Sequence, residues 1–321
     1  MPKNVPGAVA GALAVTLVLS GCGPSPAGAS SPVAVTVGVM PGADLAPLYL
    51  GLEQGFFAEE GITLRIDSLA PSTTGIVSAV EQGSYDFGYA DILSVLEAAE
   101  EGREVTVVSG AAATSGNILG DYTALMVPAA SEITTLADLA GRRVGVEALG
   151  ATNHVVLAAI LEAEGADPAS IDWQTVPYLD ASESLAAGTV DAAVIVEPFA
   201  TAGKIDGMTA IAYPHAEFAA NLTVTGYFTS VATAEGDPGL VERFAAAVAR
   251  SLGYATEHQT ETRDHIAATI AAHSQVRTRV QLPTFTAEVD RDAVELLVEA
   301  AVAQGRLQST DVLDLALPAG D

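Results

Sequence analysis

The sequence predicts an α/β protein of two similar lobes, each a mostly parallel sheet with flanking helices. A unit of helix, glycine and strand that ends in an acidic residue runs from Ser78 to Asp91, and a similar unit runs from Leu185 to Glu197. Gly188 in the second unit takes the place of Gly83 in the first. Open α/β sheets bind ligands beyond the carboxyl ends of their strands, so two such ends facing each other predict a binding crevice.

Composition is compatible with two folded lobes and argues against one class of partner. The chain has 321 residues, of which 50% are hydrophobic, so each lobe can bury a core. Acidic residues number 40 and basic residues 13, which gives a net charge of -27. Such a charge repels phosphate backbones, so we expect no nucleic-acid partner. We interpret the acidic surface as solvated and expect a monomer.

The first 21 residues have the pattern of a signal peptide. Lys3 precedes an apolar run from Ala8 to Leu19 that is too short to span a membrane. The run leads into Leu19-Ser20-Gly21-Cys22, which resembles the lipobox of bacterial lipoproteins, and Cys22 is the only cysteine. We therefore expect lipidation at Cys22, with cleavage after Ala29 as the alternative. Residues 22–32 are rich in Pro, Gly and Ser, as in a flexible tether.

The first lobe opens with a strand, helix and strand. Residues 33–39 alternate and are β-branched, and Asp44 stands where an N-cap is expected before a helix over 45–54. A second strand follows over 62–66, and the right-handed crossover rule makes the two strands parallel. The turn between the first strand and the helix, with Pro41 and Asp44, then opens on the crevice.

Polar residues begin one helix in each lobe. Unpaired N–H groups at a helix start favour an acceptor or an anion, whereas Ser and Thr also cap helices everywhere, and for the first helix alone we favour capping. The candidate ligand-binding residues at these two starts are Ser72, Thr73, Thr74 and Gly75 in the first lobe and Gly150, Thr152 and Asn153 in the second.

Two acids follow the repeated strands, and the chain is expected to cross twice between the lobes. Asp91 and Glu197 follow the two repeated strands and are candidate ligand contacts; Asp91 is equally compatible with capping, and Asp44 fits a cap better. Lobe 1 is expected over 33–120 plus 225–321, and lobe 2 over 121–224. Helices follow to the end of the chain. Three histidines, His258, His265 and His273, are too widely spaced for the usual metal-ligand pairs, so we expect no metal and no cofactor.

The chain resembles a family of solute-binding proteins of ABC importers. These are the binders of aliphatic sulfonates, taurine and nitrate (SsuA-like) and the NMT1/THI5-like group. The resemblance covers residues 33 to about 205, and it rests on Ala46-Pro47-Leu48-Tyr49, on Gly55-Phe56-Phe57, on the two repeated units and on the stretch over 135–144. It implies a type II periplasmic-binding-protein-like fold with two crossover hinge strands, and ligand held between the lobes at the loop with Pro41, the two helix starts and Glu197.

The resemblance also implies partners and a location. We expect an extracytoplasmic protein, anchored by lipid to the outer face of the cell membrane, that delivers its ligand to a permease and its ATPase. Hydroxyl-rich helix starts suit a sulfonate or nitrate, yet no Lys or Arg falls among the candidate residues, and the acids suit an amine. A zwitterion or a neutral nitrogen heterocycle fits both observations.

Three alternatives stay open from the sequence. The chain is compatible with a binder of thiamine-pyrimidine precursors, and with a binding protein that feeds a sensor. An enzyme of the THI5-like pyrimidine-synthesis type is the third, and we do not expect it. Such relatives use a histidine and a cysteine-rich iron motif, whereas this chain has Cys22 alone, and His154 is its only histidine near the predicted crevice.

Overall fold

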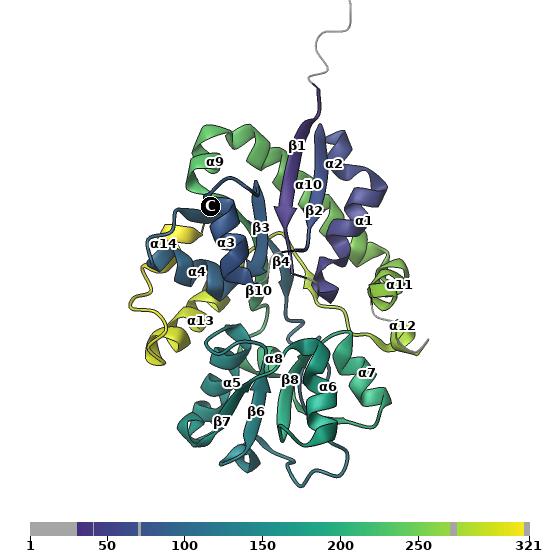
Figure 1. Ribbon diagram of the computed structural model, residues 1–321, viewed down its shortest axis with the longest axis vertical. Coiled ribbons are helices and arrows are strands. Elements are labelled where there is room, and N and C mark those ends of the chain that lie inside the picture. The colour runs from purple at the N-terminus through teal and green to yellow at the C-terminus, as the bar shows by residue number, and fades with distance from the viewer. Residues whose placement is uncertain (1–30, 41, 70–71, 270–274, 318–321) are drawn as a thin grey trace, which may run out of the picture. The chain divides into compact units, whose positions relative to one another are not determined.

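The computed structural model describes residues 31–40, 42–69, 72–269 and 275–317. The expected signal peptide, Cys22, the tether up to residue 30 and Pro41 lie outside these residues. The described residues hold two separate sheets, each with helices packed against it (Figure 1). No helix among them is long and apolar enough to cross a membrane.

The first sheet has six strands among the described residues, in the order β11-β4-β10-β3-β1-β2. β1 pairs in parallel with β2 and with β3, while β10 pairs antiparallel with β3 and with β4. β2, β1, β3 and β4 therefore share one direction, as predicted for the first lobe. The strands are β1 (Val33–Gly38), β2 (Ile62–Asp67), β3 (Phe87–Asp91), β4 (Val105–Ala113), β10 (Thr223–Ser230) and the short β11 (Thr284–Phe285).

The second sheet repeats this plan in the order β7-β6-β8-β5-β9. β6 pairs in parallel with β7 and β8, and β5 runs antiparallel between β8 and β9. In each sheet the reversed central strand, β10 or β5, is the first one after the chain crosses from the other sheet. The strands are β5 (Thr123–Val127), β6 (Arg143–Val146), β7 (Asp172–Thr175), β8 (Ala192–Val196) and β9 (Thr209–Ala212).

Helices connect the strands of both sheets. Those associated with the first sheet are α1 (Ala46–Gln54), α2 (Phe56–Glu59), α3 (Thr73–Glu81), α4 (Ile92–Glu100), α9 (Val231–Gly236), α10 (Pro238–Glu257), α11 (Gln259–Thr269), α12 (Val276–Arg279), α13 (Arg291–Ala303) and α14 (Val312–Ala316). Those associated with the second sheet are α5 (Thr152–Ala163), α6 (Tyr178–Ala187), α7 (Phe199–Ile205) and α8 (Pro214–Phe218). Short 3-10 turns cover Ala43–Leu45, Leu136–Leu139 and Pro168–Ser170.

The repeated unit of the sequence has the same structural role in both sheets. Asp86, before β3, accepts a hydrogen bond from the Thr36 amide at 2.7 Å, and Asp191, before β8, accepts one from the Arg143 amide at 2.9 Å. Each aspartate thereby ties its strand to a neighbouring parallel strand, β1 for β3 and β6 for β8. Gly188 adopts a φ of 68°, the left-handed conformation that ends a helix at low cost for glycine.

Interior strands such as β5 and β8 are buried on both faces, which explains their nearly continuous apolar sequences. Successive side chains of β5 pack on opposite faces of the sheet. Leu125 and Val127 pack with Leu157 of α5, while Ala124 and Met126 pack with Leu185 of α6. In the first sheet, α3, α4 and α13 contribute to one core and α1, α2 and α10 to the other.

One expected helix start is wrong. Asp44 lies inside the 3-10 turn Ala43–Leu45, Gly42 precedes that turn, and Leu45 is the N-cap of α1. A turn of 3-10 helix therefore separates β1 from α1, and the Asp44 carboxylate is free to make other contacts.

Candidate functional site

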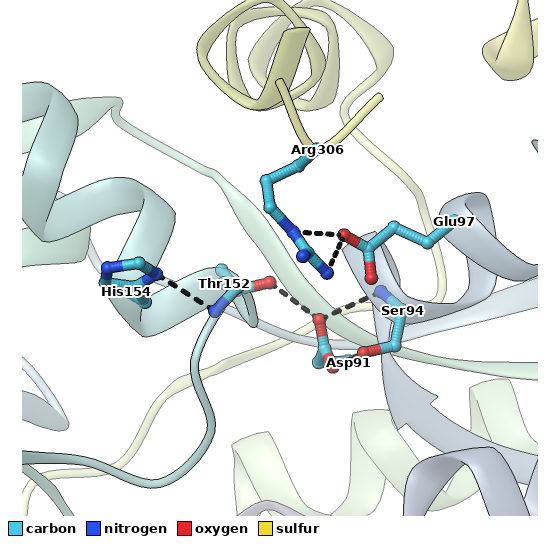
Figure 2. A network of polar contacts seen from close by, with 7 residues as sticks. Asp91, Ser94, Glu97, Thr152, His154 and Arg306 are labelled. Carbon is cyan, nitrogen blue, oxygen red and sulfur yellow. Dashed lines mark hydrogen bonds and ion pairs between the residues drawn. The ribbon is translucent and has the colours of Figure 1, made fainter. Parts of the chain in front are cut away.

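Asp91 joins elements of the two sheets. It ends β3 and caps α4, accepting a hydrogen bond from the Ser94 amide at 3.1 Å and another from the Ser94 hydroxyl. The hydroxyl of Thr152, the first residue of α5, donates to the same carboxylate at 2.7 Å (Figure 2). The N-terminal ends of α4 and α5 therefore meet at this aspartate. The helix start predicted for the first lobe is that of α3, so this contact leaves the prediction about the two helix starts untested.

The loop before Thr152 is held by polar contacts. The Gly150 amide donates to Nδ1 of His154 at 2.9 Å, so this ring nitrogen carries no proton. Burial and the nearby Arg306 lower the pKa of His154, which agrees with a neutral ring. Arg306 itself forms an ion pair with Glu97, with its Nε at 3.0 Å from the carboxylate (Figure 2).

Gly150 is required at its position for two reasons. Its φ is 88°, and a Cβ added there would lie 2.4 Å from the guanidinium carbon of Arg306. Any larger residue would strain the backbone and displace the arginine. The predicted role of Gly150 as a ligand contact stays a prediction, and the structure gives it this positioning role in addition.

Asp44 lies among hydroxyl groups. The Thr225 hydroxyl of β10 donates to its carboxylate at 3.3 Å, and the Tyr89 hydroxyl of β3 donates to Thr225 at 2.8 Å. Burial raises the pKa of Asp44, and the hydrogen bonds from Tyr89 and Thr225 offset part of this rise. Asp44 is therefore a half-buried acid whose bonded partners are neutral.

Glu147 is the counterpart of Asp44 on the second sheet, and sequence reasoning missed it. The Asn153 amide nitrogen donates to Glu147 at 2.8 Å and to the Tyr178 hydroxyl at 2.8 Å. Burial raises the pKa of Glu147 to about 7, and the charge of Asp91 adds to the rise. The sequence could have indicated Glu147, because this residue directly follows β6. Asp91 was selected by the same rule, that ligands bind beyond the carboxyl ends of strands.

Acids from both sheets raise the pKa values of the same tyrosines. Asp44 and Glu147 both raise the pKa values of Tyr122 and Tyr178, which burial already places well above the ordinary value. We call this set of side chains the acidic cluster: Asp44, Asp91, Glu147, Asn153, Tyr89, Tyr122 and Tyr178.

The hydroxyl-rich start of α3 behaves as a cap. The Ser72 hydroxyl accepts from the Gly75 amide at 3.2 Å, and the Thr73 hydroxyl lies 3.7 Å from the sulfur of Met40. Ser72 and Thr74 are exposed, and the described contacts do not link the four residues to the acidic cluster. Capping is thus what the structure shows for Ser72, the role favoured from the sequence.

Glu197 is buried and its carboxylate is engaged by neighbouring donors. Its side chain is 1% exposed, and it accepts hydrogen bonds from the Thr201 amide at 3.0 Å and the Thr201 hydroxyl at 2.7 Å. The Gln281 amide adds a contact at 3.3 Å. Glu197 therefore caps α7 and bonds to the segment after α12. Its oxygens are already engaged by these donors, and its predicted role as a ligand contact stays a prediction.

A separate cavity of about 400 Å³ lies beside this capped helix. Among its lining residues are three basic side chains, Lys204, Arg263 and Arg279, together with Thr201 and Gln281. Arg263 donates to the Val280 carbonyl at 3.2 Å, and Lys204 to the Tyr213 hydroxyl at 3.3 Å. We call it the basic cavity. Within the described part of the chain, no group of three or more His, Cys, Asp or Glu is placed to hold a metal ion.

The paired sheets, each with a reversed strand at the crossing, define a two-lobe periplasmic-binding-protein fold of type II. A family model described as NMT1/THI5 like matches residues 43–262, so the chain belongs to the NMT1/THI5-like family. No curated protein sequence matches the chain.

Solved structures share the fold at low sequence identity. The alkanesulfonate-binding protein SsuA from Xanthomonas axonopodis pv. citri, bound to MOPS, is 19% identical with a TM-score of 0.75, covering 90% of this chain and 99% of that one. SsuA of Escherichia coli is 19% identical with a TM-score of 0.71, covering 86% and 94%. The desulfurization enzyme DszB is 17% identical with a TM-score of 0.61, covering 89% and 96%.

Proposed function

We propose that this protein is the extracytoplasmic solute-binding lipoprotein of an ABC importer. In this proposal its two lobes, 33–120 plus 225–321 and 121–224, capture a small nitrogen- or sulfur-containing organic compound and deliver it to a membrane permease. The family and the fold support a binding protein, and the names of the two SsuA structures support transport of this class of compound.

One observation carries the position of the site. Asp91 of the first sheet bonds to Thr152 of the second at 2.7 Å, and Asp44 and Glu147 act on shared tyrosines. Side chains from the carboxyl ends of strands in both sheets thus meet in the acidic cluster. A ligand bound there contacts both lobes only when they are closed, and so it favours the closed state.

Thermal unfolding tests this function. Residues 31–321, of which 32–321 form one compact unit, are unfolded and refolded to remove retained ligand and then heated with taurine, alkanesulfonates, nitrate, aminopyrimidines and small amines. A ligand at a hundred times its dissociation constant adds about 2.7 kcal/mol of stability. We expect one class to raise the melting temperature.

Two variants locate the effect. The double variant Asp44→Asn with Glu147→Gln should lose the shift, whereas Glu53→Gln, on the exposed face of α1, should keep it. A ligand that stabilises the double variant as much as the parent would contradict the proposed position of the site. No stabilisation by any class would contradict the binding function as tested by this panel.

A further inference from the structure

The acids of the cluster have no basic partner among the described residues. Asp44 bonds to Thr225, and Glu147 to Asn153, and both partners are neutral. Asp91 bonds to Ser94 and Thr152, also neutral. Half-buried carboxylates with neutral partners repel an anion and gain most from a positive charge placed between them.

The nearest basic groups are used elsewhere. Arg306 forms an ion pair with Glu97, with its NH2 nitrogen at 2.8 Å from the carboxylate. Lys204, Arg263 and Arg279 line the basic cavity next to α7 and α12. A cationic ligand supplies the positive charge that the cluster lacks.

A buried acceptor in the cluster lacks a donor. Asn153 is 3% exposed, and its amide nitrogen bonds to Glu147 and Tyr178, but its Oδ1 has no hydrogen-bond partner among the described residues. A buried carbonyl oxygen without a partner is costly, so a ligand N–H group is the natural complement. Carboxylates, this amide oxygen and tyrosine rings together favour a nitrogen cation that carries N–H donors.

Exposed apolar side chains follow the strands that lead toward the cluster. They are Met40 after β1, Leu69 after β2, Leu149 after β6 and Leu179 at the start of α6, with exposed fractions of 41%, 85%, 52% and 76%. These side chains stand just beyond the carboxyl ends of strands, as the acids do, and apolar surface there suits a ligand with a carbon skeleton beside its charge.

We infer that the ligand is a small organic cation, an amine or a protonated nitrogen heterocycle, held by Asp44, Glu147 and Asn153. This inference rests on the proposed binding function and names its ligand class. It separates this chain from the SsuA proteins of similar fold, whose names describe alkanesulfonate binding. Sulfonates and nitrate are not ligands of the acidic cluster.

Matched probes test the sign of the charge. Calorimetry and thermal unfolding are run with benzylamine, benzyl alcohol and phenylmethanesulfonate, which share a ring and differ in charge, and with 4-aminopyridine, taurine and ethanesulfonate. A small-molecule cell extract is also split on cation- and anion-exchange resins, so that the result does not depend on the chosen skeleton. We expect stabilisation by the cationic probes or by the fraction retained on the cation exchanger.

Variants connect the charge to the cluster. Asp44→Asn and Glu147→Gln should each weaken binding of the stabilising cation by about tenfold or more, whereas Glu53→Gln should leave it unchanged. The two acids lie on different sheets, so two single variants keep the test independent of a fold defect in either one.

Four outcomes overturn the inference. Stabilisation by the anionic fraction or a sulfonate alone leaves the binding function intact and contradicts a cationic ligand. If Arg279→Gln abolishes this stabilisation, the anion binds in the basic cavity. Stabilisation by the neutral fraction alone likewise contradicts a cationic ligand and leaves the binding function intact. Stabilisation that EDTA abolishes identifies a metal ion instead. No stabilisation by any fraction contradicts the binding function itself.

Discussion

Glu147 is the residue whose chemistry depends most on the fold. It follows β6, and its carboxylate accepts from Asn153 at 2.8 Å without a bonded basic group among the described residues. Burial raises its pKa to about 7 from a model-compound value of 4.5. The folded protein therefore holds this proton more tightly than the unfolded chain does, and stability should fall as pH rises from about 4.5 to 7.

We expect Glu147→Gln to remove this pH dependence. Each pKa unit corresponds to about 1.4 kcal/mol, so the free energy of unfolding of the variant, relative to the parent, should rise by roughly 2 to 3 kcal/mol between pH 5 and pH 8. Urea denaturation at several pH values measures it.

The comparison between variant and parent cancels other titrations. His215 is buried, and burial lowers its pKa to about 4, so it contributes a stability that is lost as pH falls through 6.5 toward 4. This contribution is the same in both proteins. A free-energy difference that does not change with pH would show that Glu147 is ionised in the folded protein at pH 5.

At the scale of elements, the facing starts of α4 and α5 form the best-defined link between the sheets. Asp91 caps α4 and accepts the Thr152 hydroxyl at 2.7 Å, and Thr152 is 2% exposed. A hydrogen bond to a charged group contributes more than one between neutral groups. Each helix start thus stabilises the other through a single carboxylate.

Thr152→Val should therefore lower the free energy of unfolding by about 1 to 3 kcal/mol, because the side chain keeps its shape and loses only the donor. Equilibrium denaturation in urea measures the change. Thr63→Val, the same substitution at an exposed position of β2, is the control. If the free energy of unfolding falls equally little in both variants, the hydrogen bond between α4 and α5 does not contribute to stability.

At the scale of the whole molecule, two acids link the lobes in similar ways. Asp91 caps α4 and accepts from Thr152, and Glu197 caps α7 and accepts from the Gln281 amide at 3.3 Å. Each follows a strand of one sheet and reaches a segment associated with the other. The net charge of -27 keeps such a molecule soluble through repulsion, and it gives no electrostatic attraction to an anionic membrane surface.

The proposed attachment to the membrane rests on the lipid predicted at Cys22. We expect Cys22→Ala, expressed in the native host, to move the protein from the membrane fraction to the soluble fraction, and incorporation of labelled palmitate to stop. Cys22 is the only cysteine, so the substitution leaves no other thiol to modify. An unlabelled, soluble parent protein would support cleavage after Ala29 instead.

Much of the fold was predictable from local patterns. The glycine that ends α6 and the short apolar run of β5 are visible in the sequence, because helix ends and buried strands impose residue types on neighbouring positions. Thr135 and Asp138 form a capping box, and their spacing of three residues is the local pattern that indicates one. The start of α1 was misplaced, because an acidic N-cap and an acid in a preceding 3-10 turn have the same local signature.

The site was predictable only in part. The sequence by itself determined which strand ends and helix starts carry polar groups, and Asp91 and Thr152 became candidates in this way. It did not determine which of these groups are engaged by other residues, and so it made Glu197 a candidate and did not select Glu147. Only the tertiary structure decided this, because burial and hydrogen bonding depend on contacts between residues far apart in the chain: Gln281 engages Glu197 at 3.3 Å, whereas Glu147 has neutral bonded partners and a raised pKa.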